Sequence, residues 1–164
     1  MNLHSVLVAG VVLASAPAQA NNELVILPQP EFSNSLMLDM SRSLNAVSVL
    51  QPHQGPGAAK VIDVSIEGDF NGGPLGTSFT GAASSVGLTS GSITQSGFDN
   101  HITASVTGSR NLFAFAQDGG GNRLTASISG IANQAAVSQT GFNNVVGLSQ
   151  SGIGNMISIS QTSW

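Results

Sequence analysis

In the carboxy-terminal half of the chain, apolar and polar residues alternate in short runs that recur with a period of 11. Each run starts at an Asn and places apolar side chains two and four positions later, with small or polar residues between them. Alternation over five to seven residues predicts a β-strand with one buried face, and no helical period fits. The apolar pairs are Ile102 and Ala104, Phe113 and Phe115, Leu124 and Ala126, Ala135 and Val137, Val146 and Leu148, and Ile157 and Ile159.

Three columns of the repeat hold a fixed or nearly fixed residue type. Six consecutive matches in each of two columns make the period of 11 the strongest signal in the chain. The Asn column is Asn100, Asn111, Asn122, Asn133, Asn144 and Asn155, and the Gly column is Gly97, Gly108, Gly119, Gly130, Gly141 and Gly152. The third column reads Gln95, Val106, Gln117, Ile128, Gln139, Gln150 and Gln161.

The repeat unit combines a strand of about seven residues with a turn of about four. A Gly at a fixed turn position indicates a positive φ or a close approach of the next layer. Such units build either a meander or a solenoid, and identical columns favour the solenoid, because stacking puts each column in register with itself. The sequence therefore predicts an all-β solenoid that forms cross-β stacks on assembly.

The third column indicates two strands per coil of about 22 residues. Its members then lie on two sides, with Gln95, Gln117, Gln139 and Gln161 on one side and Val106, Ile128 and Gln150 on the other. Inward amides without partners would cost a few kcal/mol each, so we expect the Asn and Gln columns to form continuous hydrogen-bonded ladders. The six Asn residues and the Gln members of the third column, Gln150 included, are the predicted polymer ladder.

The regular repeats cover residues 91–164, and a degenerate form covers residues 34–90. In the degenerate part, Arg42 stands at a Gly position and Lys60 at an Asn position, and residues 52–59 replace a normal turn. The register is lost over residues 72–90, which we expect to form a loop or one degenerate coil. Residues 21–33 fit no repeat and are predicted to be a flexible leader.

An apolar run from Ser5 to Ala16 precedes the small-residue sequence Ala18-Gln19-Ala20. This arrangement is typical of a signal peptide, so residues 1–20 are expected to be removed on export. The run is too short for a membrane-spanning helix, which needs about 20 apolar residues. The alternative is a buried amino-terminal helix.

Composition narrows the range of functions. The chain has 8 acidic and 4 basic residues and no Cys, so no disulfide, thiolate metal site or Cys nucleophile is expected, and nucleic acid is not expected as a partner. His53 and His101 do not have the spacing of metal ligands. The segment that begins at Asp118 is similar to a Gly-rich calcium-binding repeat, but it occurs only once. No Ser lies in a hydrolase motif. We expect no enzyme activity, cofactor or metal.

The spacing Gln-x4-Asn-x5-Gln recurs at Gln139, Asn144, Gln150, Asn155 and Gln161 and resembles the curlin repeat of bacterial curli fibre subunits. The resemblance covers residues 91–164 and, loosely, residues 34–71, with Val106 and Ile128 departing from the Gln column. It implies a secreted subunit of an extracellular, amyloid-like fibre for adhesion and biofilm matrix. The implied partners are further copies of the chain, other curlin subunits and an outer-membrane secretion apparatus.

Polymerisation is also expected on physical grounds. An uncapped solenoid presents unpaired strand edges at both ends. No Pro follows Pro74, and the charges after residue 90 (Asp99, Arg110, Asp118 and Arg123) sum to zero, a composition typical of cross-β assembly. The alternative function is a soluble secreted β-solenoid that binds a carbohydrate or another surface through its outward Ser and Thr side chains.

Overall fold

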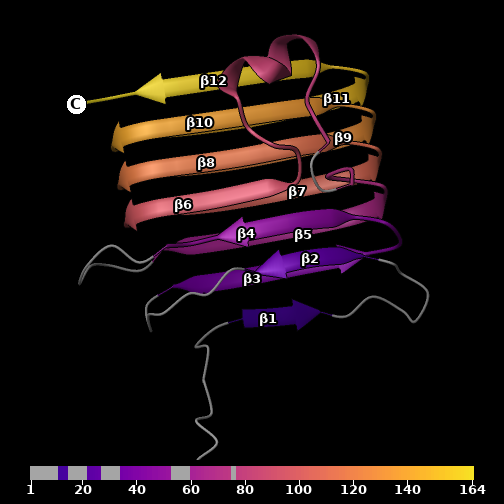
Figure 1. The fold of residues 1–164 in the computed structure, drawn as a ribbon, viewed down its shortest axis with the longest axis horizontal. Coiled ribbons are helices and arrows are strands. Elements are labelled where there is room, and N and C mark those ends of the chain that lie inside the picture. Colours follow the sequence, from indigo (N-terminus) through magenta and orange to yellow (C-terminus); the bar gives the residue numbers. More distant parts are fainter. Residues whose placement is uncertain (1–10, 15–21, 27–33, 53–59, 75–76) are drawn as a thin grey trace, which may run out of the picture.

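The computed structural model describes residues 11–14, 22–26, 34–52, 60–74 and 77–164, the first of these ranges by its backbone alone. Within these ranges, two parallel sheets of six strands each face one another, and consecutive strands alternate between them (Figure 1). Sheet A contains β1 (Val11–Ala14), β3 (Ser35–Ser41), β5 (Val61–Asp69), β7 (His101–Ser109), β9 (Arg123–Ile131) and β11 (Val145–Ile153). Sheet B contains β2 (Glu23–Ile26), β4 (Ala46–Leu50), β6 (Ser92–Phe98), β8 (Leu112–Gly120), β10 (Gln134–Phe142) and β12 (Met156–Thr162).

Each strand of the regular repeats pairs in register with the next strand but one along the chain. Ile102 of β7 lies beside Leu124 of β9, which lies beside Val146 of β11. One coil therefore contains one strand of each sheet, and the predicted solenoid with two strands per coil is confirmed.

The space between the sheets is filled by the apolar side chains that the alternation pointed inward. Phe113 and Phe115 of β8 are buried there, with ring centroids 5.7 Å apart. Phe115 lies beside Ile93 in the register of β6 and β8. At the preceding inward position, the Gly91 N–H donates to the Phe113 carbonyl at 2.7 Å. A residue without a side chain therefore lies beside one of the two buried Phe residues.

Between Gly72 and Gly91 the chain leaves sheet B and returns to it. Ala46 donates its N–H to the Asn71 carbonyl at 2.9 Å, and Ser48 donates to the Gly91 carbonyl at 2.8 Å. The intervening residues form an excursion with a short 3₁₀ helix, η1 (Gly81–Val86), and make no coil of their own. We call residues 73–90 the strap, of which residues 75 and 76 lie outside the described part.

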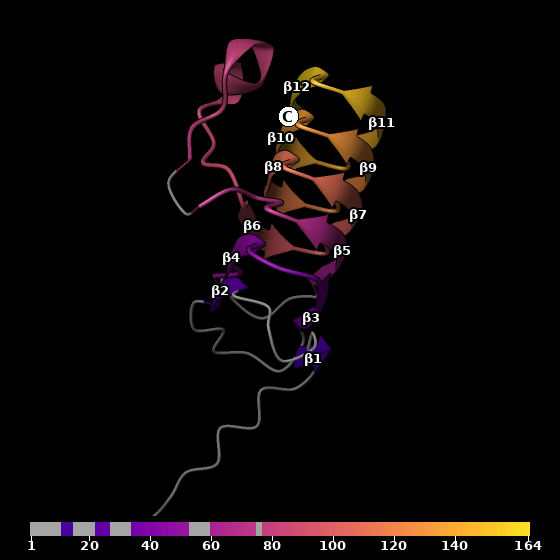
Figure 2. The same cartoon turned by 90° about the vertical axis from the view of Figure 1, so that its right-hand side faces the viewer.

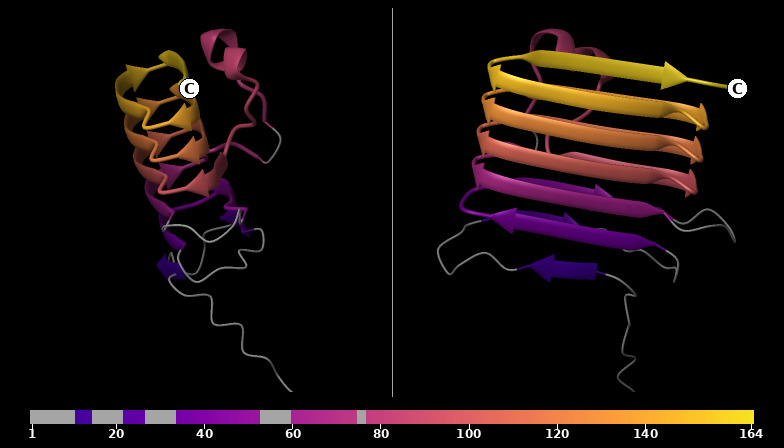
Figure 3. Two further views of the ribbon diagram at one scale, coloured as in Figure 1. Left: turned by 90° about the vertical axis from the view of Figure 1, so that its left-hand side faces the viewer. Right: turned by 180° about the vertical axis from the view of Figure 1, so that it is seen from behind.

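The strap packs on the outer face of sheet B (Figure 2). Its buried Phe79 and Ala83 contact Ala114 of β8 and Ala136 of β10, which form a small apolar cluster outside the main core. The Ser85 and Ser158 hydroxyls lie 2.7 Å apart, so the strap reaches β12. Seen from behind, sheet A carries no such cover among the described residues (Figure 3).

Two short strands precede the repeats. β1 lies inside the predicted signal peptide and pairs with β3, and β2 lies inside the predicted flexible leader and pairs with β4. The rest of the signal peptide and leader, apart from Asn22, and residues 53–59 of the predicted loop lie outside the described residues. In the described part of the chain, no helix has the length and apolar character needed to cross a membrane.

Candidate polymer ladder and stacking edges

A continuous row of Gln side chains runs through the interior along sheet B. Each Nε2 donates to the Oε1 of the Gln in the next coil, at 2.8 to 3.1 Å. The members before the last are at most 1 % exposed, so every link lies away from water except the final one, which is part-buried. In chain order the row is Gln51, Gln95, Gln117, Gln139 and Gln161.

A row of Asn side chains runs along the turns that lead into sheet B. Each Oδ1 accepts the backbone N–H of the Asn in the next coil at 2.9 to 3.1 Å, so the Asn row donates toward the amino-terminal end. The Gln row donates toward the carboxy-terminal end. In chain order the Asn row is Asn22, Asn45, Asn71, Asn111, Asn133 and Asn155.

The Asn side chains also close the turns. The Asn133 Nδ2 donates to the Ser129 carbonyl and to the Gly152 carbonyl, each at 3.0 Å. Both carbonyl groups lie near the carboxy-terminal ends of sheet A strands, Ser129 in β9 and Gly152 in β11. An Asn at this position is therefore bonded to its own turn and to both neighbouring coils.

A second Asn row leads into sheet A and is shorter. Asn144 donates its backbone N–H and its Nδ2 to the Asn122 Oδ1, and Asn122 donates its N–H to the Asn100 Oδ1 at 3.0 Å. Lys60 stands where the next Asn would lie toward the amino terminus, between Asn100 and Asn34.

Lys60 places a charged group at an interior position. The side chain is 3 % exposed, and its Nζ donates to the Pro52 carbonyl. Desolvation by burial lowers the pKa of this ammonium below its usual value of 10.5. The amide row of sheet A is therefore interrupted after Asn100.

Gln150 does not stack on another Gln, although it belongs to the predicted ladder. It lies beside Ile128, which lies beside Val106 in β7, so this column of sheet A is apolar up to its last member. The Gln150 Nε2 donates to the Gln134 carbonyl at 3.2 Å, and its buried Oε1 has no partner among the described residues.

The glycines of the predicted Gly column adopt a conformation that suits Gly alone. Their φ angles lie between 91° and 118°. A Cβ on Gly130 would lie 1.9 Å from the Gly152 carbonyl oxygen, so the column also permits a close approach of backbones. The same two conditions hold at Gly97, Gly108, Gly119 and Gly141, while Gly152, in the last coil of sheet A, shares only the positive φ.

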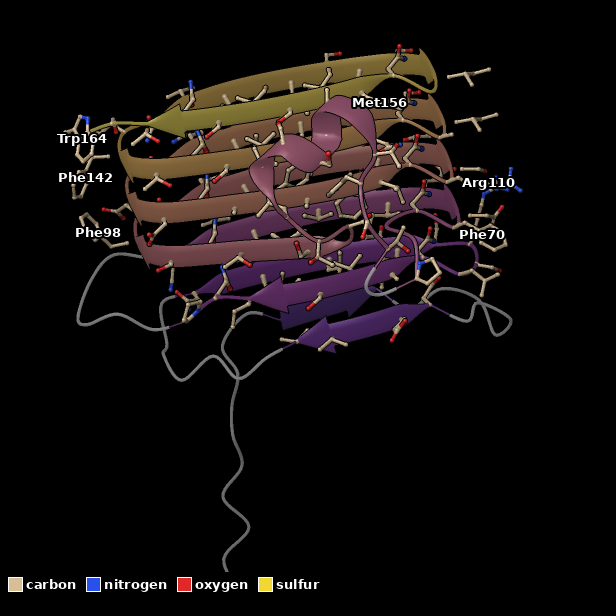
Figure 4. All side chains as sticks on the ribbon, turned by 45° about the horizontal axis from the view of Figure 1, so that its top comes forward. Phe70, Phe98, Arg110, Phe142, Met156 and Trp164 are labelled. Atoms are coloured by element: carbon tan, nitrogen blue, oxygen red, sulfur yellow. The ribbon has the colours of Figure 1, made fainter. Side chains whose placement is uncertain are left out.

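Exposed aromatic side chains lie at the turns, at opposite ends of the strands (Figure 4). At one end, the Phe98 and Phe142 rings lie 6.2 Å apart between centroids. Gly120 stands between these two residues in the register, and a Cβ there would meet the Phe98 ring at 2.5 Å. At the other end, the Arg110 guanidinium lies 5.9 Å from the Phe70 ring centroid. Ring contacts thus connect the turns outside the amide ladders.

Four further residues of the ladders lie outside the regular columns. Asn45, Asn71 and Gln51 occur in the degenerate repeats, where the spacing of 11 indicated their positions. Asn22 was missed because it stands in the predicted leader. Its only sequence signal is that it stands about one coil before Asn45.

The described residues contain no group of three or more His, Asp or Glu side chains placed to hold a metal ion. The His101 Nε2 lies 3.0 Å from the Thr103 hydroxyl, and Asp118 accepts a hydrogen bond at its backbone carbonyl from Asn122. His53 lies outside the described residues. The chemistry that this interior supports is amide-to-amide stacking along one axis.

The comparisons with known proteins agree with this arrangement over one part of the chain. Residues 130–162, which span β10, β11 and β12, match the family model described as the Curlin associated repeat. Neither a curated protein nor a solved structure matches the chain.

Proposed function

We propose that this chain, whose residues 130–162 carry the curlin associated repeat, is the structural subunit of an extracellular, curli-like amyloid fibre. Copies assemble by strand pairing between their ends, and adhesion and biofilm matrix formation are properties of the polymer. The proposal includes export through a signal peptide at residues 1–20, secretion across the outer membrane and a structural rather than catalytic role.

The observation that carries the proposal is the Gln ladder, which runs from Gln51 to Gln161 and ends on β12, a strand without a further neighbour in its sheet. β11 and β12 end their sheets, and Gln161 is only partly buried. A solenoid with an unpaired edge and a polar ladder open at that edge gains hydrogen bonds by adding a coil of the same sequence.

Assembly can be followed on purified residues 21–164 after release from denaturant, by thioflavin T fluorescence, electron microscopy and fibre diffraction. We expect a lag, a rise, unbranched fibres and a reflection near about 4.8 Å. Preformed fibres should abolish the lag. A β-rich protein that stays monomeric and in the supernatant for a day at micromolar concentration would contradict the proposal.

A matched pair of variants tests the ladder itself. In the first, Gln139, Asn144, Gln150 and Asn155 are changed to Ala, which removes inward amides. In the second, the exposed Ser105, Ser127, Ser149 and Ser160 are changed to Ala. The first should slow or abolish fibre formation and the second should leave it near that of the unchanged chain. Equal fibrillation of both would show that the amides do not organise the polymer.

The alternative function, a soluble solenoid that binds a carbohydrate or another surface, has one specific observation in its favour. The outer face of sheet A carries exposed Ser105, Ser127 and Ser149 in one register column, with Thr103 and Thr125 in the next. Retention of the monomer on a polysaccharide resin, lost when the three Ser residues are changed to Lys, would favour this function.

A further inference from the structure

The amino-terminal strand β2 makes the same hydrogen bonds to β4 that β8 makes to β10 and β10 makes to β12. The Asn22 Oδ1 accepts the Asn45 N–H at 3.1 Å, and the Glu23 N–H donates to the Asn45 carbonyl at 2.8 Å. In the last coils, the Asn133 Oδ1 accepts the Asn155 N–H, and the Gln134 N–H donates to the Asn155 carbonyl at 2.7 Å. β2 therefore takes the position beside β4 that the sheet B strand of a preceding coil would take.

The replacement is incomplete, because two buried polar atoms of the coil formed by β3 and β4 lack partners among the described residues. The Gln51 Oε1 accepts no hydrogen bond from any described residue, although every later Gln Oε1 of the row accepts one from the preceding coil. The Asn34 Nδ2 likewise has no acceptor within the described part of the chain. A buried polar group without a partner costs about 1 to 3 kcal/mol. A neighbouring coil that supplies a donor for the Gln51 Oε1 and an acceptor for the Asn34 Nδ2 would therefore stabilise the coil formed by β3 and β4.

The carboxy-terminal coil, formed by β11 and β12, offers the complementary groups. The Gln161 Nε2 continues a row in which each Nε2 donates onward, and the Asn144 Oδ1 continues a row in which each Oδ1 accepts from the next coil. Asn155 and Met156 stand at the register positions of Asn22 and Glu23. The last coil of one copy thus matches the first repeat of another.

We infer that β2 is an internal stand-in for β12 of a second copy, and that copies join when this β12 displaces β2 and pairs with β4, while β11 pairs with β3. In this joint Gln161 donates to Gln51, Asn34 donates to Asn144, and Asn155 replaces Asn22 as the acceptor for Asn45. The inference rests on the proposed function and specifies its contact. It places the repeats from residue 34 onward in the fibre core.

The geometry of a coil requires the displacement once export has removed residues 1–20, and β1 with them. Sheet B then starts at β2, one strand earlier than sheet A, which starts at β3. β11 and β12 belong to one coil and end together. A second copy that keeps β2 in place can therefore pair β12 with β2 or β11 with β3, and it cannot make both pairings without a gap.

Cysteine pairs test the joint directly, because the chain has no Cys. Ser35 and Val145 are exposed and belong to one register column, so the joint places their Cα atoms about 4.8 Å apart, within the range for a disulfide. Fibres grown from a mixture of Ser35→Cys and Val145→Cys chains, each as residues 21–164, should yield disulfide-linked dimers on oxidation. A mixture of Arg123→Cys and Val145→Cys should not, because these positions stay at least two strands apart between copies.

Two further mixtures distinguish the alternative joints. If β2 stays in place and pairs with β12, Glu23→Cys and Met156→Cys chains should crosslink instead, since these residues share a column of sheet B. If β2 stays in place while β11 pairs with β3, positions 35 and 145 still link, but a mixture of Ser48→Cys and Ser158→Cys chains gives no dimer, because only displacement brings these two positions of one column together. Fibres that give the product of the Glu23→Cys and Met156→Cys mixture, or that lack the link between positions 35 and 145 or the link between positions 48 and 158, would overturn the inference and leave the proposed function intact. Failure of every variant and of the unchanged chain to form fibres would refute both.

The stand-in role of β2 has a kinetic test. β2 is an edge strand, but the Glu23 N–H donates to the β4 side, and the two-residue period of a strand points the Val25 N–H the same way. Val25→Pro removes this N–H and its ring faces β4, so Pro is not tolerated here, whereas Val25→Thr keeps the strand. We expect a shorter lag for Val25→Pro than for Val25→Thr, because β4 is more readily available. An equal or longer lag for Val25→Pro would show that β2 does not occupy the joining site.

Discussion

Thr80 of the strap and Gln134 of β10 bond each other in both directions. The Thr80 N–H donates to the Gln134 Oε1 at 2.8 Å, and the Gln134 Nε2 donates to the Thr80 Oγ1 at 2.7 Å. The two residues are 54 positions apart in the chain, so the pair fixes an inserted segment to a distant strand.

Gln134→Ala is therefore expected to loosen the strap without unfolding the solenoid. Two hydrogen bonds at an exposed site contribute about 1 to 2 kcal/mol together, and the buried Phe79 and Ala83 still pack on sheet B. The measurement is the rate of proteolytic cleavage within residues 77–90 and the amide exchange of Thr80. Ser127→Ala, an exposed change on sheet A, is the control. Equal cleavage rates in both variants would contradict the expectation.

Gln117→Ala is expected to destabilise the monomer by about 2 to 5 kcal/mol. The change removes the bonds to Gln95 and Gln139, leaves the Gln139 Oε1 buried without a donor and opens a cavity. Urea unfolding of freshly released monomer, followed by circular dichroism, measures the loss. Thr125→Ala, at an exposed strand position, should change the free energy of unfolding by less than about 0.5 kcal/mol. Similar losses for both variants would show that the interior amides carry little stability.

Gly130→Ala and Gly147→Ala should have opposite effects, although both glycines lie in strands of sheet A. Gly130 has a φ of 118°, and a Cβ on it would clash with the backbone of the next coil. A Cβ on Gly147 would meet no atom within 4 Å. We expect Gly130→Ala to cost at least about 2 kcal/mol and Gly147→Ala to gain about 0.5 kcal/mol. Thermal unfolding midpoints of the two monomers test this, and a tolerated Gly130→Ala would show that the coils can separate locally.

Lys60→Met should stabilise the protein at pH 7, and the gain should shrink as the pH rises toward 10.5. Because burial lowers the pKa of Lys60 in the folded chain, the unfolded chain binds more protons between the lowered value and 10.5. The stability of the unchanged protein thus rises through that range, and the full cost of the buried ammonium is present below it. Denaturant midpoints from pH 7 to 10.5 measure the difference.

The control for this pH dependence is Arg123→Met, which removes an exposed cation at the neighbouring register column. Its curve of stability against pH should run parallel to that of the unchanged protein. Parallel curves for Lys60→Met as well would mean that the Lys60 ammonium reaches water in the folded chain.

The two-strand coil and the Gly turns could be predicted from the sequence. In a stack of coils, equivalent residues such as Gln117 and Gln139 lie directly beside each other, so the same residue type recurs at a fixed spacing. The strap could not be predicted in the same way. Its contacts join Phe79 and Ala83 to Ala114 and Ala136, which occupy ordinary outward strand positions and carry no periodic signal. β2 was missed for a related reason, since a four-residue strand offers too few positions to reveal a repeat.

The strap gives the assembled polymer a property that a bare stack of coils would lack. Each copy carries one strap, on one sheet, and contributes five coils from β3 to β12. At about 4.8 Å per coil, successive straps in the proposed joint lie roughly 24 Å apart along the fibre axis. The outer face of sheet B then carries one protruding strap per copy along the fibre, whereas the outer face of sheet A carries no strap. We therefore expect fibres to associate laterally through the outer face of sheet A. The straps also give the fibre an axial repeat equal to the length of one copy.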